Sequence, residues 1–155
     1  MEHALIGEEY LFMGFNGKKG CTVAEIEKLP EGQWAELING EMYMLAAPAL
    51  VHQDILGWIY MKIRSYIAEG KGKCKVLPAP FAVYELDDEY NYVEPDISVI
   101  CDEGGLDEKG CHGAPDWVIE IVPPSSKYMD YVRKLTLYQL AGDGNTGSWI
   151  LYRRV

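Results

Sequence analysis

The sequence predicts a small α/β domain, and three segments carry this prediction. Trp117 to Val122 reads WVIEIV, a nearly apolar run with the length of a buried strand. Residues 92–101 form a second run rich in Val and Ile, and residues 50–69 carry apolar side chains at the spacing of an amphipathic helix. With 155 residues, of which 48% are apolar, the chain can bury a core, and we expect one domain over residues 1–155.

The first expected elements are a short helix and a hairpin. Residues 1–21 lack clear periodicity and are expected to form an arm or a hairpin. A short helix should begin at Thr22, because Thr22 can cap its first turn and Glu25 stands at the capping-box position. The dipeptide Asn39-Gly40 then joins two alternating apolar runs, which predicts a hairpin with a type I′ turn.

A long helix is expected from Leu50 to Glu69, with Gly70 as its stop. Lys75 to Glu85 resembles a strand but contains two prolines, which cannot donate to a ladder, so it should lie at an edge or around a bend. A helix over residues 128–140 and a short strand over residues 148–152 complete the expected elements.

The net charge of −10 argues against nucleic acid binding, because Lys and Arg supply the contacts to phosphate. A local basic strip can still dock a phosphate chain on an acidic protein, although such strips are more often solvated faces. The candidate strips are Lys62 with Arg64, then Lys71, Lys73 and Lys75, and finally Arg133 with Lys134.

Other classes are disfavoured by simple patterns. No stretch approaches the roughly 18 apolar residues of a membrane span, and residues 1–10 lack the basic start of a signal peptide, so we expect a cytoplasmic protein with no membrane partner. The four cysteines contain no C-x-x-C pair, which argues against a zinc ribbon and a disulfide framework. We therefore expect reduced thiols.

Glu120 is the sharpest anomaly in the sequence. An ionised carboxylate inside a buried strand is costly unless a metal or another cation compensates it. A second carboxylate, Asp96, begins another apolar strand directly after a proline. If the two strands pair, the carboxylates can lie side by side, and their hard oxygens suit Mg²⁺ or Mn²⁺.

The motifs AELINGEMYML, VHQDIL, EPDISVI, GAPDWVIEIVPPSS and DYVRKLTLYQLAG, in this order, resemble the Uma-two type of restriction endonucleases in the PD-(D/E)xK nuclease superfamily. The resemblance runs over about residues 22–142. It implies a restriction-endonuclease-like fold of the α/β (α+β) class, with a mixed central β-sheet flanked by helices. It also implies Asp96 and Glu120 as catalytic metal ligands, Mg²⁺ or Mn²⁺ as the cofactor and DNA as the substrate.

The family continues beyond residue 142 with further strands, so the C-terminus of this chain is expected to be shortened. An edge strand left uncovered there would invite pairing with another chain, and we therefore expect a homodimer or a higher assembly.

The catalytic lysine departs from the simple motif, which has it two residues after the glutamate, where this chain has Val122. The family often carries the lysine on the following helix instead, which matches Lys134. Spacing gives some support, because Lys134 and Tyr138 share a helical face. The alternative is a surface ion pair between Asp130 and Lys134.

For several further residues the sequence allows either a role in the site or a purely structural role. Glu36 matches a glutamate of the family's hairpin and is expected as a third metal ligand, whereas Glu41, across the turn, is either near the site or simply facing solvent. Glu94 is a further ligand or an edge charge, and His52 is a site residue or a hydrogen-bonded structural histidine. Ser125 either contacts a phosphate or caps the following helix.

Three hypotheses for function follow. The first is a Mg²⁺-dependent endonuclease that hydrolyses phosphodiester bonds of DNA. The second is a catalytically inactive nuclease fold that serves as a binding or regulatory module, as Val122, the shortened C-terminus and the acidic charge suggest. The third is a small-molecule metal enzyme that shares the metal site and ignores DNA.

Overall fold

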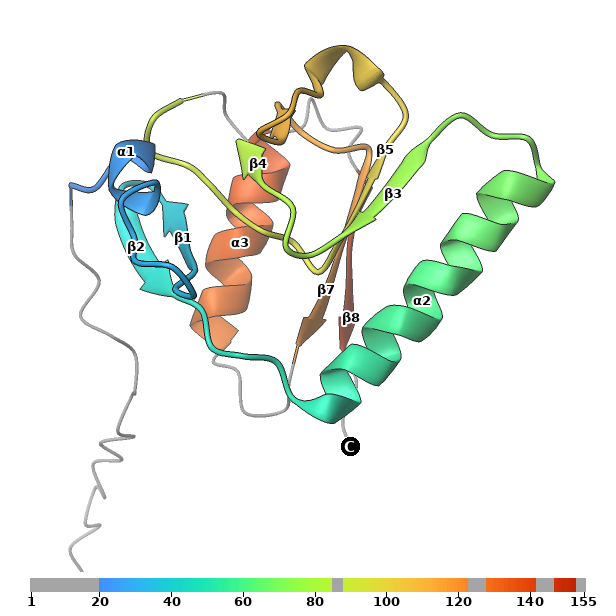
Figure 1. Ribbon diagram of the computed structural model, residues 1–155, viewed down its shortest axis with the longest axis horizontal. Coiled ribbons are helices and arrows are strands. Elements are labelled where there is room, and N and C mark those ends of the chain that lie inside the picture. Colours follow the sequence, from blue (N-terminus) through green and yellow to red (C-terminus); the bar gives the residue numbers. More distant parts are fainter. Residues whose placement is uncertain (1–19, 85–87, 123–127, 142–146, 153–155) are drawn as a thin grey trace, which may run out of the picture.

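The computed structural model describes residues 20–84, 88–122, 128–141 and 147–152 (Figure 1). All but the last two residues of the arm or hairpin predicted for residues 1–21 lie outside this part of the chain. The helices are α1 (Val23–Ile26), α2 (Leu50–Glu69) and α3 (Tyr128–Ala141), with a 3₁₀ turn at Glu103–Gly105. The strands are β1 (Ala35–Ile38), β2 (Glu41–Met44), β3 (Lys75–Pro78), β4 (Val83–Tyr84), β5 (Ile97–Ile100), β6 (Cys111–His112), β7 (Trp117–Val122) and β8 (Gly147–Tyr152).

The central sheet has four strands in the order β3-β5-β7-β8. Pairing is antiparallel from β3 to β5 and from β5 to β7, and parallel from β7 to β8. Helix α2 lies on one side of this sheet and α3 on the other (Figure 1). The predicted class, a mixed central sheet flanked by helices, is therefore confirmed.

Each face of the sheet buries its own apolar cluster. On the α2 side, Leu56 and Ile59 pack against residues of β3, β5 and β7, namely Val76, Ile97, Val99, Ile119 and Ile121. On the α3 side, Leu137 and Tyr138 join Ile100 and Val118. Alternate residues of β5 and β7 thus point to opposite faces, as expected of strands covered on both sides.

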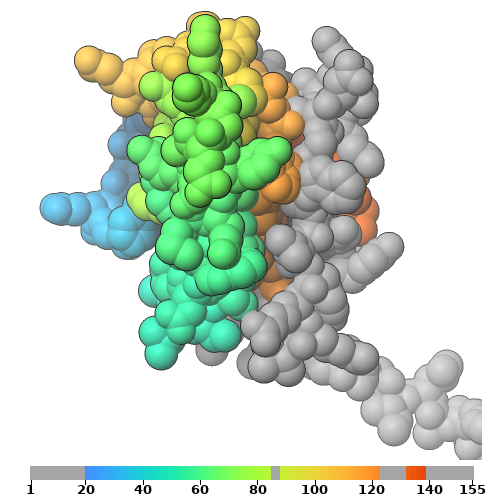
Figure 2. All heavy atoms as spheres, turned by 90° about the vertical axis from the view of Figure 1, so that its right-hand side faces the viewer, coloured from blue at the N-terminus to red at the C-terminus, as the bar shows by residue number. Residues whose placement is uncertain are grey.

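Helix α2 covers the side of the molecule that Figure 2 faces. Its outer surface leaves several large apolar side chains exposed, namely Leu50, Val51, Trp58, Met61 and Tyr66. Among the described residues, no helix is both long and apolar enough to cross a membrane.

The predicted hairpin is confirmed. Strands β1 and β2 pair with Ile38 opposite Glu41, and the two turn residues, Asn39 and Gly40, have φ angles of 51° and 73°. Both angles lie in the left-handed region that a type I′ turn requires. The helix expected after Thr22 is also present, with the Thr22 N–H donating to the Glu25 carboxylate at 2.7 Å.

The two proline-containing segments, residues 75–85 and 92–101, form shorter strands than the sequence predicted. Lys75–Pro78 forms β3 at the edge of the sheet, whereas Val83–Tyr84 leaves that sheet and pairs with β6. In the segment 92–101, only Ile97–Ile100 forms a strand, preceded by isolated bridges at residues 92 and 93. A Pro95 residue that has no N–H to donate separates the two parts.

The expectation of four reduced thiols is wrong for one pair, because Cys74 and Cys101 form a disulfide. The reason lies in the antiparallel register of β3 and β5. Lys75 pairs with Ile100, so the next residues outward, Cys74 and Cys101, stand opposite one another. The Cys111 thiol is buried and donates a hydrogen bond to the Gly113 carbonyl.

Candidate active site

Asp96 and Glu120 meet where β7 approaches its carboxyl end. Glu120 lies on β7 and Asp96 directly precedes β5. These strands pair antiparallel, with Ile97 opposite Ile119, so Asp96 lies one step beyond this pair, beside Glu120. The Ile121 N–H donates a hydrogen bond of 2.6 Å to Asp96 Oδ2. The predicted pairing of the two strands is confirmed, and this backbone contact fastens the Asp96 side chain to β7.

Glu120 is buried on the α3 side of the sheet and is held by two residues of that helix. Lys134 Nζ lies 3.0 Å from Glu120 Oε1, and the Tyr138 hydroxyl donates to the same oxygen at 2.6 Å. Lys134 and Tyr138 are four residues apart and therefore share one face of the helix, as the spacing predicted. The cation that a buried glutamate requires is, in this structure, the ammonium of Lys134.

The Lys134 ammonium joins two buried carboxylates, because it also lies 2.8 Å from Glu36 on β1. Burial disfavours the charged form, but Glu120 and Glu36 together outweigh it and raise the pKa of Lys134 above its ordinary value. The lysine is therefore a fixed positive charge at neutral pH. The side chain of the alternative partner, Asp130, lies outside the described residues.

Glu36 lies deep in the fold, with only 3% of its surface exposed. Burial raises the pKa of its carboxyl group, and the neighbouring Lys134 partly offsets this. The Glu94 N–H also donates to Glu36 Oε1 at 3.1 Å. Glu36, Lys134 and Glu120 thus form a continuous polar chain from the hairpin to the central sheet.

Asp96 has a second partner in His52, which belongs to the first turn of α2. His52 Nε2 lies 3.1 Å from Asp96 Oδ1. Burial, and next the charge of Glu120, raise the pKa of Asp96. The other ring nitrogen, His52 Nδ1, is buried and has no hydrogen-bond partner among the described residues. His52 therefore orients Asp96 from the opposite side of the sheet to Lys134.

The side chains of the remaining predicted residues have other partners or lie outside the described part of the chain. Glu41 forms an ion pair with Arg133 at 3.8 Å, and Glu94 accepts a hydrogen bond from the Tyr92 hydroxyl at 2.6 Å. Ser125 lies outside the described residues. Within the described residues, no group of three or more His, Cys, Asp or Glu side chains could hold a metal ion.

Sequence reasoning missed two contacts of this site. The Tyr138 hydroxyl on Glu120 had a signal, because Tyr138 follows Lys134 at helical spacing. The Ile121 N–H on Asp96 had none, because a backbone donor is available at every residue except proline.

Comparison with solved structures supports the fold. The chain is similar to a protein described as "a putative nuclease belonging to DUF820" from Anabaena variabilis, with a TM-score of 0.65 and 21% sequence identity. The match covers 83% of this chain and 72% of the other. At this identity the likeness shows the fold alone, and it agrees with the predicted restriction-endonuclease-like architecture.

Comparison with families supports the sequence motifs. No curated protein matches the chain. The model of the Uma2 family, described as "Putative restriction endonuclease", matches residues 23–143, which agrees with the expected range of 22–142 and includes Asp96, Glu120 and Lys134. Because this match spans most of the 155 residues, the chain belongs to the Uma2 family of putative restriction endonucleases.

Proposed function

We propose that this protein is a metal-dependent endonuclease of the PD-(D/E)xK type, which hydrolyses phosphodiester bonds of DNA with Mg²⁺ or Mn²⁺. One observation carries the proposal: Asp96 directly precedes β5, Glu120 lies on the neighbouring strand β7, and the Lys134 ammonium lies 3.0 Å from Glu120. Two carboxylates can hold a divalent cation, and a fixed ammonium can stabilise the negative charge that develops on the attacked phosphate.

The residues fit a divalent cation. Their oxygens are hard ligands, and Mg²⁺ is usually bound by one or two carboxylates together with water and substrate phosphates. After burial, the charge of Glu120 is the next cause that raises the pKa of Asp96, because the two carboxylates repel each other. A bound cation would relieve this repulsion. Once bound, such a cation polarises the scissile phosphate and lowers the pKa of an attached water.

The surrounding residues have positioning roles in this proposal. Tyr138 holds Glu120, and His52 holds Asp96, so neither carboxylate is free to turn away. Glu36 contributes through Lys134, whose ammonium it binds at 2.8 Å. The role of Glu36 as a direct metal ligand stays a prediction, as do the accessory roles of Glu41, Glu94 and Ser125.

The test is cleavage of supercoiled plasmid and of single-stranded DNA with Mg²⁺ or Mn²⁺. We expect the wild type to cut, and Asp96→Asn and Glu120→Gln to lose activity by about 100-fold or more. Glu69→Gln is the matched control, because it removes a carboxylate at the far end of α2, about 25 Å along the helix from His52. A wild type that cuts neither substrate, or an active Asp96→Asn, contradicts the proposal.

A second candidate is a catalytically inactive nuclease fold that binds or regulates. It is favoured by one contact, since Lys134 already compensates the buried charge of Glu120 without a metal. Thermal unfolding separates the two candidates. A working site should show a rise in melting temperature with Mn²⁺ that Glu120→Gln loses, whereas an inactive fold should show no rise.

We also propose a homodimer. Among the described strands β8 ends the central sheet, with β7 on one side only, and an open strand edge favours pairing with a second copy. Light scattering that gives only monomer at micromolar concentrations would argue against this assembly.

A further inference from the structure

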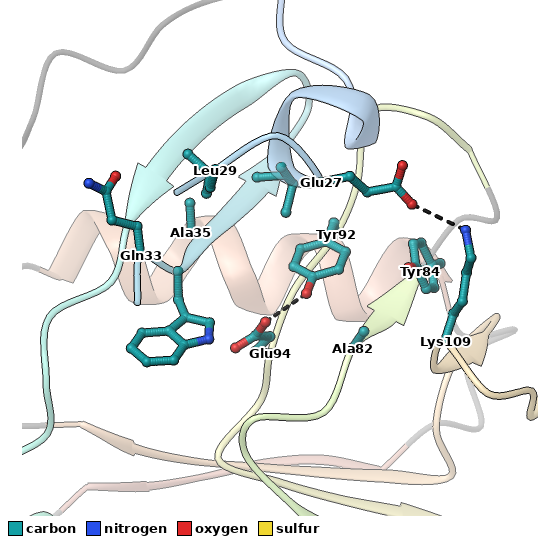
Figure 3. Close-up of a pocket in the computed structure, with 11 residues that line it drawn as sticks. Glu27, Leu29, Gln33, Ala35, Ala82, Tyr84, Tyr92, Glu94 and Lys109 are labelled. Carbon is teal, nitrogen blue, oxygen red and sulfur yellow. Dashed lines mark hydrogen bonds and ion pairs between the residues drawn. The ribbon is translucent and has the colours of Figure 1, made fainter. Parts of the chain in front are cut away.

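A cavity of about 290 Å³ opens beside β1 and the segment that leads into β5 (Figure 3). Its walls come from α1, the start of β1, the residues around β4 and the segment that leads into β5. Three of the lining side chains are aromatic, namely Trp34, Tyr84 and Tyr92. Its volume is at the lower end of the range for small-molecule sites, which favours a small ligand over a large one.

Strand β1 and the segment before β5 connect this cavity with the candidate active site. Ala35 lines the cavity, whereas its neighbour Glu36 points the other way and binds Lys134. Glu94 also lines the cavity, and its N–H donates to Glu36. Only two residues of backbone, at most about 7 Å, separate Glu94 from Asp96. A nucleotide bound at Asp96 would therefore have its own base or a neighbouring base within reach of the cavity.

Glu94 presents a carboxylate held in one orientation. The Tyr92 hydroxyl donates to Glu94 Oε1 at 2.6 Å, and the two side chains point toward one another in Figure 3. Burial and this hydrogen bond raise the pKa of Tyr92, so the phenol remains a donor at neutral pH. Among the described residues, none donates a hydrogen bond to the other oxygen, Oε2. A carboxylate accepts and cannot donate, so it selects a ligand edge that carries N–H groups.

The aromatic side chains suit a base. The Trp34 side chain is 52% exposed although it lines a cavity, and an exposed indole offers a face on which a base can stack. Tyr84 and Tyr92 meet edge to face, with their ring centres 5.5 Å apart, so the two rings hold each other in place. Lys109 pairs with Glu27 at 3.2 Å beside Tyr84, so the rim carries a cation near the ligand (Figure 3).

We propose that this cavity binds one unstacked nucleobase of the substrate, guanine best, with Trp34 stacking on its face and Glu94 accepting from its N1–H and N2–H₂ edge. Guanine fits because these two donors are adjacent, whereas the single N3–H of thymine lies between two carbonyls that the carboxylate would repel. The inference rests on the proposed function in that it takes the substrate to be a nucleic acid strand.

The test is binding of fluorescently labelled short DNA strands, followed by anisotropy at low salt in EDTA, so that no cleavage occurs. One strand is all thymine and the other has a single central guanine. We expect the wild type to bind the guanine strand about tenfold more tightly, and Glu94→Gln to lose most of this preference. Glu103→Gln is the matched control, because Glu103 is exposed and pairs only with Lys75 among the described residues.

A second arm tests stacking. Trp34→Ala should weaken binding of both strands roughly tenfold, and Trp34→Phe should restore most of it. Trp58→Ala is the matched control, because Trp58 is 60% exposed but lies on α2, away from the cavity. Equal binding of the two strands by the wild type, or equal binding by Trp34→Ala and Trp58→Ala, overturns the inference.

Cleavage and base preference are measured separately, so the two proposals can fail separately. Cleavage of DNA without guanine preference would overturn the cavity assignment and leave the nuclease proposal standing. Guanine preference in EDTA without cleavage in Mg²⁺ or Mn²⁺ would support the cavity assignment and contradict the nuclease proposal.

Discussion

Lys134 binds Glu120 across the interface between α3 and the central sheet, with Nζ 3.0 Å from Oε1. The same ammonium binds Glu36 of the hairpin at 2.8 Å. One side chain of α3 therefore connects the central sheet with the hairpin, which lies 98 residues away in the sequence. The contact explains how a strand that is otherwise apolar tolerates a carboxylate, because a buried charge must be paired.

The first prediction follows from this ion pair. Lys134→Met leaves Glu36 and Glu120 buried without their cation, and it should lower the free energy of unfolding by about 3 kcal/mol, the low end of the range for a broken buried pair, because the lysine side chain is 22% exposed. Urea denaturation measures it. Lys75→Met, which removes an exposed partner of Glu103, should cost at most about 1 kcal/mol. Equal losses in the two variants would contradict the central role of Lys134.

The second prediction concerns the hydroxyl that holds Glu120. Tyr138→Phe keeps the ring but removes the donor at 2.6 Å, so Glu120 should be less well oriented. We expect the affinity for Mn²⁺ or the rate of cleavage to fall about 10-fold to 100-fold, as for other residues that orient a metal ligand. Calorimetric Mn²⁺ titration and plasmid cleavage give the two readouts. Tyr66→Phe, at an exposed tyrosine, should bind Mn²⁺ and cleave as the wild type does. A Tyr138→Phe protein with wild-type affinity and cleavage would exclude the role of Tyr138 in orienting Glu120.

The third prediction concerns the disulfide between Cys74 and Cys101. It closes a loop with a sequence separation of 27 residues, and the loss of such a cross-link should lower stability by about 3.5 kcal/mol. Denaturation with and without a reducing agent measures the effect. Cys74→Ala should be as unstable as the reduced wild type and should not respond to the reducing agent. If titration of the unfolded, unreduced protein finds all four cysteines as thiols, the disulfide is excluded.

The fourth prediction contrasts two glycines. Gly40 has a φ of 73° in the hairpin turn, and a Cβ there would lie 3.4 Å from the Cys21 carbonyl, so Gly40→Ala should cost about 1–2 kcal/mol. Gly57 lies inside α2, and no described atom comes within 4 Å of an added Cβ, so Gly57→Ala should stabilise by about 0.5–1 kcal/mol. Chemical denaturation of both variants measures the change in the free energy of unfolding. A change of the same sign in both variants would contradict the assigned turn.

The fifth prediction is a pH dependence at Asp107. Its carboxylate accepts N–H groups of Lys109 and Gly110, and these bonds lower the pKa of Asp107 below its ordinary value of 3.8. A depressed pKa stabilises the fold above pH 3.8, and that contribution is lost as the pH falls through the folded-state value. The stability gap between the wild type and Asp107→Asn should therefore shrink below about pH 4. A carboxyl titration by NMR with a midpoint at or above 3.8 would refute this.

Much of the fold could be predicted because its signals are local. The Asn39-Gly40 turn, the capping pair of Thr22 with Glu25 and the apolar stripe of α2 each lie within a few residues of sequence. The limits of α2 agree with the prediction, Leu50 to Glu69, and β7 has the predicted bounds. Local patterns of this kind determine an element whatever packs against it later.

The features that could not be predicted depend on register between distant segments. The Cys74–Cys101 disulfide follows from the pairing of Lys75 with Ile100, which no spacing in the sequence reveals. The cavity beside β1 is likewise built from four separate stretches of chain. Glu120 marks the intermediate case. The sequence showed that the carboxylate needed a cation, and the family resemblance pointed to Lys134, but only the packing of α3 shows that the Lys134 ammonium reaches Glu120.

The register of β7 has a consequence for how the molecule can change. Strand β7 pairs with β8 along its whole length and with β5 over residues 117–119. Glu120 therefore cannot shift unless the hydrogen bonds of the sheet break. Trp34 and Glu94 lie outside this sheet. Substitutions at Trp34 and Glu94 should therefore change the base preference without altering β5 and β7, the strands that position Asp96 and Glu120.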